Sequence, residues 1–494
     1  MDFLEPNAKK KRAISQIIGY TLIGILIAIA TLILVFQAYG FDVDRKTGDV
    51  IQNGLVFVDS APDDAAIFLN GNLHKDRTNV RLTLTEGTYE LKIRKDGYRD
   101  WVRTFELLGG SIERYTYPML IPNDLAQKDI ASLGQAPTFY TQSLDRKFII
   151  HNKGASLTDW VEHDTSSLDG SEKPLERAFS LPAELFQAAE GAHSLELVEW
   201  STDNRHFLVK HTYTGGYEFV VISRDSPATS LNVNKLLGQN PNTLVLRDKK
   251  FDQWYLHTTE GGVLQTANAQ KQIETVMNNV TAFKSHDDTT LLYTEAGDDP
   301  KMQRVMLRQN KETYHIRDIS AGPVKLDVAK YDNAWYVAVG SQADKKIYIY
   351  KDPISQIDKA ARADYKPTLS AVLRSNDTLD QVSFSQNTRF IMAQSGQHIE
   401  VYDAEYQKTY RHDVAKTFDS GVKLTWMDGH RLQSRSGGKI IMFDYDGANL
   451  QELVGSVPGV AFFDRDYTVL YGASVKDSGE AALNVTSLRF EQDK

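Results

Sequence analysis

Twenty-nine consecutive residues without a charge, from Ala13 to Phe41, follow directly on the basic stretch Lys9 to Arg12. Within this segment, residues 17–36 have Ile, Leu, Val or Phe at 13 of 20 positions. An α-helix rises about 1.5 Å per residue, so 20 residues span about 30 Å, the thickness of a bilayer's hydrocarbon core. The sequence therefore predicts a single transmembrane helix over residues 13–41.

The charges on either side of this segment predict its orientation. Four cations at positions 9–12 precede it, whereas Asp42 and Asp44 come first on the far side. Lys and Arg accumulate on cytoplasmic flanks, so we expect residues 1–12 to be a cytoplasmic basic tail and the C-terminal domains to be extracytoplasmic. A cleaved signal peptide is the alternative, although its apolar region usually runs about 7 to 15 residues. We therefore expect a single-pass protein of the cell membrane, with the bilayer as its first partner.

The composition of the remaining chain narrows the classes of function. Beyond residue 12, 52 Lys and Arg residues face 63 Asp and Glu residues, a net charge of −11. This balance argues against a nucleic-acid partner. Cysteine is absent, so disulfides and thiolate metal sites are excluded and packed cores must supply the stability. A single core stops growing at about 250 to 300 residues, so more than one domain or a repeated unit is expected.

The first domain is expected at residues 55–121, after a polar linker at residues 42–54. Short stretches with the alternation of β-strands are separated by turn signals such as Asn70-Gly71 and Asp96-Gly97. Six short strands in about 65 residues predict a small β-sandwich or barrel.

Within this domain the residues resemble a known family. Pro62-Asp63-Asp64-Ala65, Phe68 to Gly71, Leu84 to Tyr89 and Lys95 to Tyr98 are similar in order and spacing to a PEGA domain, a β-module common in bacterial and archaeal surface proteins. The name-giving Pro-Glu-Gly-Ala differs here, because Asp64 replaces the glycine. The resemblance implies a non-enzymatic module that contacts envelope layers or wall polymers.

Residues 122–494 contain a repeat of a polar turn followed by an apolar strand. The turn occurs eight times, marked by Asp145, Asp203, Asp252, Asp287, Asp332, Asn387, Asp428 and Asp466. The first and last markers lie 321 residues apart, a mean interval of about 46 residues. Four-stranded propeller blades recur at about 40 to 50 residues, so the repeat predicts a β-propeller of eight blades, with seven as the alternative.

One repeat resembles a known signature. Trp200 to Arg205 is similar to the Trp-Ser-Pro-Asp-Gly-Arg of TolB-like and WD40-like repeats. The last repeat has three evident strands, which predicts that a strand near residues 124–133 closes the ring. The fold class expected for the chain is therefore mainly β: a transmembrane helix, a PEGA-like β-sandwich and a C-terminal β-propeller.

A search for chemical motifs gives no catalytic, cofactor-binding or metal-binding residue. The chain has no Gly-x-Ser-x-Gly elbow, His-Glu-x-x-His, phosphate loop or dinucleotide fingerprint. His206 and His211 are the closest histidines, and we interpret them as surface or turn residues. The marker aspartates are interpreted as caps of their own turns. We therefore expect no enzyme activity and no cofactor.

One basic cluster is a candidate for envelope contact, although a solvated strand face is the alternative. It surrounds the turn at Gly97 and comprises Lys92, Arg94, Lys95, Arg99, Trp101 and Arg103. The second candidate is the axial mouth of the propeller, where loops of all blades converge.

The leading functional hypothesis is a membrane-anchored bacterial cell-surface protein for binding or scaffolding. Its PEGA-like module contacts the envelope and its propeller binds an envelope protein or glycan. The alternatives are a surface glycan hydrolase or lyase with its site at the propeller mouth, and a structural subunit of an envelope or secretion complex.

Overall fold

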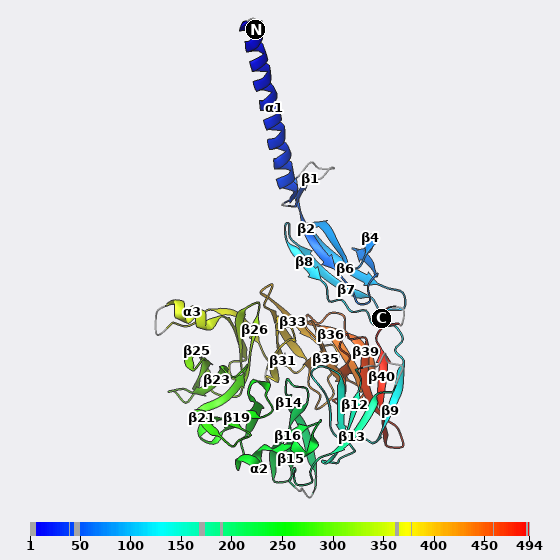
Figure 1. Cartoon of the computed structure of the whole chain (residues 1–494), viewed down its shortest axis with the longest axis vertical. Coiled ribbons are helices and arrows are strands. Elements are labelled where there is room, and N and C mark those ends of the chain that lie inside the picture. The colour runs from blue at the N-terminus through cyan, green and yellow to red at the C-terminus, as the bar shows by residue number, and fades with distance from the viewer. Residues whose placement is uncertain are drawn as a thin grey trace, which may run out of the picture. The chain divides into compact units, whose positions relative to one another are not determined.

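The computed structural model describes residues 6–38, 40–43, 50–166, 173–187, 191–360, 365–376, 378–457, 459–490 and 493. The chain divides into two compact units, residues 1–123 with 491–494, and residues 124–490. The first unit contains an N-terminal helix and a small β-domain, and the second is built from four-stranded sheets (Figure 1). Residues 1–5 of the predicted basic tail lie outside the described residues.

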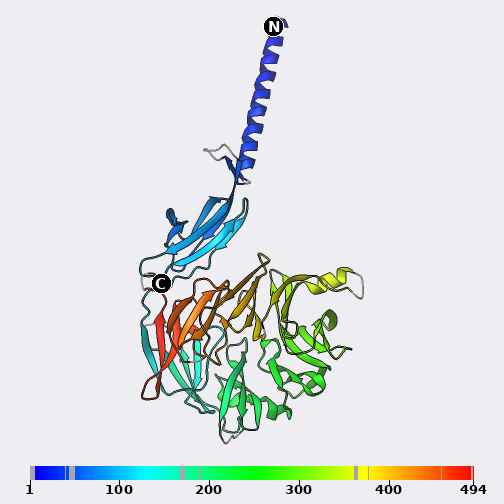
Figure 2. The ribbon, with the colours of Figure 1, turned by 180° about the vertical axis from the view of Figure 1, so that it is seen from behind.

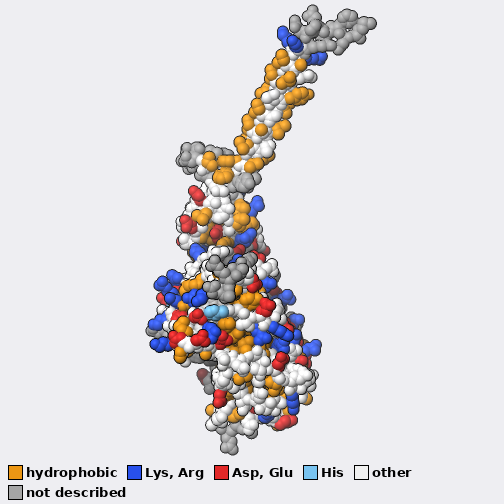
Figure 3. Space-filling view, turned by 90° about the vertical axis from the view of Figure 1, so that its left-hand side faces the viewer, with side chains coloured by type: hydrophobic (Ala, Val, Ile, Leu, Met, Phe, Trp, Pro, Cys, Tyr) orange, Lys and Arg blue, Asp and Glu red, His pale blue; other side chains and the backbone are white. Residues whose placement is uncertain are grey.

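Helix α1 (Pro6–Ala38) contains the predicted membrane segment. Its stretch Lys10–Phe36 is long and apolar enough to cross a membrane, and no part of it is buried against the protein. Figure 3 shows apolar side chains along this helix and Lys and Arg side chains near its N-terminal end. Length and composition of this kind are shared by signal anchors and signal sequences.

The β-domain of the first unit has two four-stranded sheets. One has the order β1-β2-β5 with β8 parallel to β2, and the other the order β4-β3-β6-β7. The strands are β1 (Phe41–Val43), β2 (Val50–Val58), β3 (Ala66–Leu69), β4 (Asn72–Arg77), β5 (Val80–Thr85), β6 (Gly87–Arg94), β7 (Trp101–Leu107) and β8 (Ile112–Tyr115). Val56 and Leu82 of the first sheet share one core with Ile67, Leu91 and Trp101 of the second. This is the predicted β-sandwich.

Two details of this domain refine the sequence analysis. The predicted linker at residues 42–54 includes paired strands, since β1 lies antiparallel to the start of β2. Asp64, at the position of the family's glycine, has a φ of +54°. Asp is one of the few residues that tolerate the left-handed region, so the turn keeps its glycine-like backbone.

The second unit has eight four-stranded antiparallel sheets, here called blades 1 to 8, in a ring (Figures 1 and 2). Blades 1 to 4 comprise β10 (Tyr140–Gln142), β11 (Phe148–Asn152), β12 (Asp159–Asp164) and β13 (Leu175–Ser180); β14 (His193–Trp200), β15 (His206–Tyr213), β16 (Gly216–Ser223) and β17 (Leu231–Asn232); β18 (Thr243–Leu246), β19 (Gln253–Thr258), β20 (Val263–Asn268) and β21 (Ile273–Met277); and β22 (Val280–Ser285), β23 (Thr290–Ala296), β24 (Met302–Gln309) and β25 (Glu312–Ser320).

Blades 5 to 8 continue the same order, and the last is completed from the other end of the unit. They comprise β26 (Val324–Tyr331), β27 (Ala334–Ser341), β28 (Lys346–Lys351) and β29 (Leu369–Arg374); β30 (Gln381–Phe384), β31 (Phe390–Ser395), β32 (His398–Asp403) and β33 (Lys408–Asp413); β34 (Thr425–Trp426), β35 (Arg431–Ser436), β36 (Lys439–Asp444) and β37 (Gln451–Gly455); and β38 (Phe462–Phe463), β39 (Val469–Val475), β40 (Glu480–Ser487) and β9 (Gln127–Gln135).

The ring confirms the propeller and the direct count of eight repeats. Each of the eight sequence markers lies in the turn between the first and second strands of its blade. Strand β9 pairs with β40 and supplies the predicted closing strand. Helices are short insertions in this unit, namely α2 (Val233–Leu237) and α3 (Pro353–Ala360), together with single 3-10 turns.

The cores of this unit lie between neighbouring blades. Trp160 of blade 1 packs with Phe207 of blade 2, and Tyr336 of blade 5 packs with Ile391 of blade 6. The second strand of a blade is covered on both faces by the neighbouring blades. Its sequence is therefore a continuous apolar run, such as Phe390-Ile-Met-Ala. Each blade therefore needs its neighbours to bury its faces.

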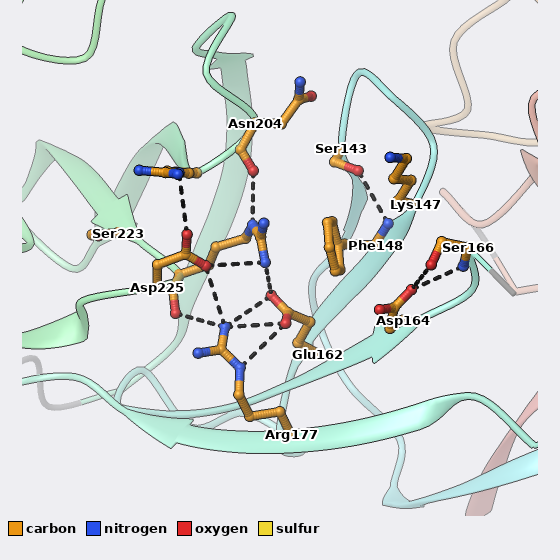
Figure 4. A network of polar contacts seen from close by, with 12 residues as sticks. Ser143, Lys147, Phe148, Glu162, Asp164, Ser166, Arg177, Asn204, Ser223 and Asp225 are labelled. Atoms are coloured by element: carbon orange, nitrogen blue, oxygen red, sulfur yellow. Dashed lines mark hydrogen bonds and ion pairs between the residues drawn. The ribbon is translucent and has the colours of Figure 1, made fainter.

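A buried ion network also joins blades 1 and 2 (Figure 4). The carboxylate of Glu162 accepts hydrogen bonds from Arg177 at 3.1 and 3.2 Å and from Arg224 at 2.8 Å. Arg224 also donates to the backbone oxygen of Asn204 and lies 3.7 Å from the ring centre of Phe148. Glu162 and Arg224 are both buried. The carboxylates of Glu162 and Asp225 together neutralise the two guanidinium groups, since Asp225 lies 3.1 Å from Arg224 and 3.8 Å from Arg177.

Candidate functional site

The second unit contains a cavity of about 1420 Å³ that we call the axial chamber. The first strands of blades 1, 2, 7 and 8 line it, namely β10, β14, β34 and β38. The turns that follow the first strands of blades 1, 6 and 8 contribute further side chains. Binding pockets for small ligands usually measure about 300 to 1,000 Å³, so the chamber has room for an oligomer.

The turns at the chamber are fixed by their own hydrogen bonds. In blade 1, Ser143 Oγ donates to Asp145 Oδ1 at 2.6 Å, and the same oxygen accepts from the amide of Lys147. In blade 6, Ser385 Oγ donates to Asn387 Oδ1 at 2.6 Å in the same way. The marker residues Asp145, Asp203, Asp287, Asn387 and Asp428 thus cap their turns, as predicted, whereas in blade 8 Asp464 accepts the corresponding bond in place of Asp466.

The residue after five of the eight markers lies in a backbone conformation that favours glycine. These five residues, Arg146, Asn204, Asn333, Thr388 and Tyr467, have φ between +56° and +61°. The Trp-Ser-Pro-Asp-Gly-Arg signature has glycine there, and Asn is tolerated. Arg and Tyr at this position cost about 1 to 2 kcal/mol each. Such strain is concentrated at functional sites, which directs attention to Arg146 and Tyr467.

Arg146 and Tyr467 meet at the turn end of the chamber. The guanidinium group of Arg146 lies 4.2 Å from the ring centre of Tyr467 and donates to its hydroxyl. It also donates to the backbone oxygens of Asp464 at 3.1 Å and Met427 at 3.3 Å and to Gln386 Oε1 at 3.4 Å. The Arg146 side chain thus connects turns of blades 1, 6, 7 and 8. We call Arg146 and the residues that it contacts, Gln386, Met427, Asp464 and Tyr467, the turn cluster.

The protonation of Tyr467 is consistent with its role in the turn cluster. Its hydroxyl donates to the backbone oxygen of Met427 at 2.8 Å. Burial raises the pKa of Tyr467, so the hydroxyl retains its proton near neutral pH.

A different set of residues lines the chamber away from the turn cluster. Lys423 Nζ forms an ion pair at 3.1 Å with Glu196 Oε1, which joins blades 7 and 2. Both side chains are largely exposed, so the pair is weak and can open without a large cost.

The lining of the chamber is cationic, whereas the whole chain has a net charge of −9. Two carboxylates, Asp145 and Glu196, line it. Five cationic side chains line it, namely Arg146, Lys147, Lys423, Arg435 and Arg465. A concave surface of one sign concentrates ligands of the opposite sign.

Several polar atoms in the lining are buried without a hydrogen-bond partner. They are the Tyr140 hydroxyl, Trp426 Nε1, Gln433 Oε1 and Ser434 Oγ. Burial raises the pKa of Tyr140 to about 12, so its hydroxyl stays protonated. Buried polar groups are usually paired, so four unpaired groups beside one cavity are unusual.

The predicted envelope-contact cluster of the β-domain is divided by the structure. Strand alternation places Lys92 and Arg94 on the outer face of their sheet, where Arg94 pairs with Asp100 at 2.6 Å. Trp101 is 3% exposed and belongs to the core, so it is not part of an exposed patch. Arg103 shares that inner face and lies over the ring of Tyr115 at 5.8 Å.

The remaining two members, Lys95 and Arg99, lie in and beside the turn between β6 and β7. Lys95 donates to the backbone oxygen of Asp63 at 2.8 Å and pairs with Asp493 at 2.8 Å. Arg99 donates through its backbone amide to the oxygen of Ile121 at 2.8 Å. Envelope contact by the outward-facing members therefore stays a prediction.

The histidines occupy structural positions. His206 binds Asp203 at 2.7 Å in its turn, as expected, but His211 is fully buried and bonded to Glu218 at 2.9 Å, contrary to the prediction of a surface or turn residue. His151 and His163, 12 residues apart, form a buried contact of 3.0 Å between their Nε2 atoms, and burial lowers their pKa values to about 4 and 3. Within the described ranges, no group of three or more potential ligands is placed to hold a metal.

Sequence reasoning predicted the axial mouth as a site but missed its residues. Arg146, Gln386 and Tyr467 meet across up to 321 positions of sequence. The one local signal was the presence of Arg146 and Tyr467 at the glycine position of the turn signature.

Comparison with known proteins gives one family match and several structural likenesses. Residues 53–114 match the PEGA domain family. An oligogalacturonate lyase in complex with manganese is similar at 10% identity, covering 75% of this chain and 99% of the lyase, with a TM-score of 0.40. The Dos1 propeller is similar at 10% identity, covering 73% and 94%, with a TM-score of 0.42. Apo AztD from Citrobacter koseri is similar at 10% identity, covering 80% and 96%, with a TM-score of 0.37.

These likenesses concern the fold alone. No curated protein sequence matches the chain. The chain thus combines an apolar N-terminal helix, a PEGA domain and an eight-bladed β-propeller.

Proposed function

We propose that the protein is a membrane-anchored surface binding protein whose axial chamber takes up an envelope component. The observation that carries this proposal is the chamber itself. It combines a volume of about 1420 Å³, a cationic lining and two strained turn residues that face one another. Strained residues persist where the surrounding structure holds them in place, which suits a preorganised site.

The proposed location follows from the N-terminal helix. Lys10, Lys11 and Arg12 precede the apolar stretch, which favours a cytoplasmic N-terminus and an extracytoplasmic propeller. The PEGA domain follows the helix directly and is the part proposed to contact the envelope next to the membrane.

The lining favours binding over turnover. Hydrolysis of glycans usually needs a pair of carboxylates that flank the bond to be cleaved. The two carboxylates of the chamber are already engaged, Asp145 by its own turn and Glu196 by Lys423. An enzymatic role stays the alternative to binding. A partner protein is the alternative to a glycan as the occupant of the exposed mouth of the chamber.

Capture of the occupant from intact cells tests the proposal. A membrane-impermeant cross-linker is added to cells carrying the tagged protein, the membranes are solubilised and the protein is recovered. We expect one envelope component to be recovered with the wild-type protein. Substitution Leu144→Trp, at a 56% exposed residue of the chamber lining, should reduce the recovery at least about tenfold by filling the mouth.

The matched control is Val475→Trp, at a 47% exposed residue outside the chamber. It should leave the recovery unchanged. Equal recovery with both variants would assign capture to another surface, and no recovery with the wild-type protein would contradict an exposed binding site.

A further inference from the structure

The charged groups of the chamber differ in how they are neutralised. Lys423 pairs with Glu196, and Arg435 pairs with Asp419 at 2.6 Å. Among the residues that the structure describes, Arg146, Lys147 and Arg465 have no carboxylate within ion-pair distance. Of the lining residues in the described ranges, Asp145 is the one carboxylate outside these pairs, so the three cations leave an excess of positive charge at the turn end of the chamber.

Arg146 is the best placed of these three cations. Its guanidinium group is half-buried, and the groups that contact it are neutral: two backbone oxygens, the Gln386 amide and the Tyr467 hydroxyl. These contacts hold the planar group in one orientation without cancelling its charge. A fixed guanidinium with a surplus charge is suited to a carboxylate or phosphate group.

The walls next to this charge are aromatic. Tyr140, Trp426, Phe462 and Tyr467 line the chamber and are each partly exposed. Flat aromatic surfaces of this kind can pack against the apolar faces of sugar rings.

Three of the four strand edges at the chamber are too short to favour an extended peptide, and the fourth, β14, has a β-bulge between Leu197 and Glu199 that interrupts its edge. β34 and β38 have two residues each, and β10 has three. Peptides that add a strand need a longer run of unpaired backbone groups. Side chains must therefore supply the recognition, which favours a glycan over a peptide.

We infer that the axial chamber binds an acidic glycan, which is a sugar or polyol chain that carries carboxylate or phosphate groups. Arg146 is the residue that binds the acidic group. This inference rests on the proposed function and names its ligand class. Lys147 and Arg465 add longer-range attraction, and the aromatic walls hold the neutral part of the chain.

Titration calorimetry of the purified protein tests the inference with four compounds. They are a uronic-acid tetrasaccharide, its neutral methyl ester, a glycerol-phosphate tetramer and a tetraglutamate peptide. We expect at least one of the two acidic glycans to bind about tenfold or more tightly than the neutral ester and the peptide, and the better acidic compound distinguishes carboxylate from phosphate.

Variants assign the effect to the chamber. Arg146→Gln should weaken binding of the preferred acidic compound by about 10- to 100-fold, and Arg146→Lys should weaken it less, since charge remains but the planar fork is lost. The matched control Arg205→Gln removes a 65% exposed arginine from the turn of blade 2, outside the chamber, and should have no effect. Lys147→Gln, at an exposed position, should cost about two- to fivefold without affecting folding.

The results separate this inference from the proposed function. Equal binding of the acidic and neutral glycans, or preference for the peptide, would overturn the acidic-glycan inference while capture from cells could still succeed. No binding of either acidic glycan at millimolar concentration would also overturn it. An unchanged affinity in both Arg146→Gln and Lys147→Gln would exclude the turn end of the chamber as the site.

Discussion

Substitution Glu162→Gln should lower the free energy of unfolding by about 3 to 5 kcal/mol, the cost of removing one partner from a buried ion pair. The carboxylate of Glu162 is bonded to Arg177 and Arg224, and Arg224 is 8% exposed. Gln has the same shape but no charge, so Arg224 would remain buried with Asp225 as its nearest carboxylate, at 3.1 Å. Since Asp225 is itself 40% exposed, it compensates poorly.

Urea unfolding of the wild-type protein and the variant measures this cost. The control Glu176→Gln makes the same chemical change at an exposed residue on β13, and it should shift stability by less than about 0.5 kcal/mol. A double variant Glu162→Gln/Arg224→Met should lose less than the sum of the two single variants, because the unpaired cation is gone. A loss below about 1 kcal/mol for Glu162→Gln would show that the network contributes little to the joint between blades 1 and 2.

Removal of strand β9 should abolish the closed ring. β9 pairs with β40 along residues 480–486, and its Ile130 and Leu133 are buried against Tyr471 and Leu483. Burying two such side chains contributes about 3 to 6 kcal/mol. Without β9, the outer edge of β40 would present unpaired backbone groups to other chains.

Two lengths of the propeller chain test this expectation. A chain that begins at Asp124 retains β9 and should be a monomer with one cooperative thermal transition. A chain that begins at Ala136 lacks β9 and should aggregate or lose that transition, as measured by light scattering and calorimetry. A monomeric shorter chain with a melting temperature within about 3 °C of the longer one would contradict ring closure by β9.

The fold could be predicted from local patterns because a propeller repeats a local unit. The marker turns depend on hydrogen bonds within a few residues, such as Ser143 to Asp145, and the sequence therefore indicated all eight positions. The three-stranded last repeat predicted β9, since an incomplete blade has an open edge. The core of the PEGA domain followed from strand alternation in the same way.

The candidate site could be predicted only as a location. Arg146, Gln386 and Tyr467 come from three blades and meet because the ring closes, which no local pattern describes. The members of the basic cluster of the β-domain are divided between two faces, whereas their nearness in sequence indicated one surface. Trp101 and Arg103 lie on the inner face of β7, because alternate residues of a strand face the same side. Both lie an even number of positions from the apolar Phe105, and this spacing could have indicated their orientation from the sequence.

Photo-crosslinking in living cells tests whether the axial chamber is occupied. A benzophenone amino acid is placed at Leu144 in the chamber lining or at Val475 outside it, and both positions are exposed in the structure. After irradiation, we expect a discrete cross-linked product of the Leu144 protein and none of the Val475 protein. Equal cross-linking at both positions, or a product at Val475 alone, would contradict a binding site in the chamber.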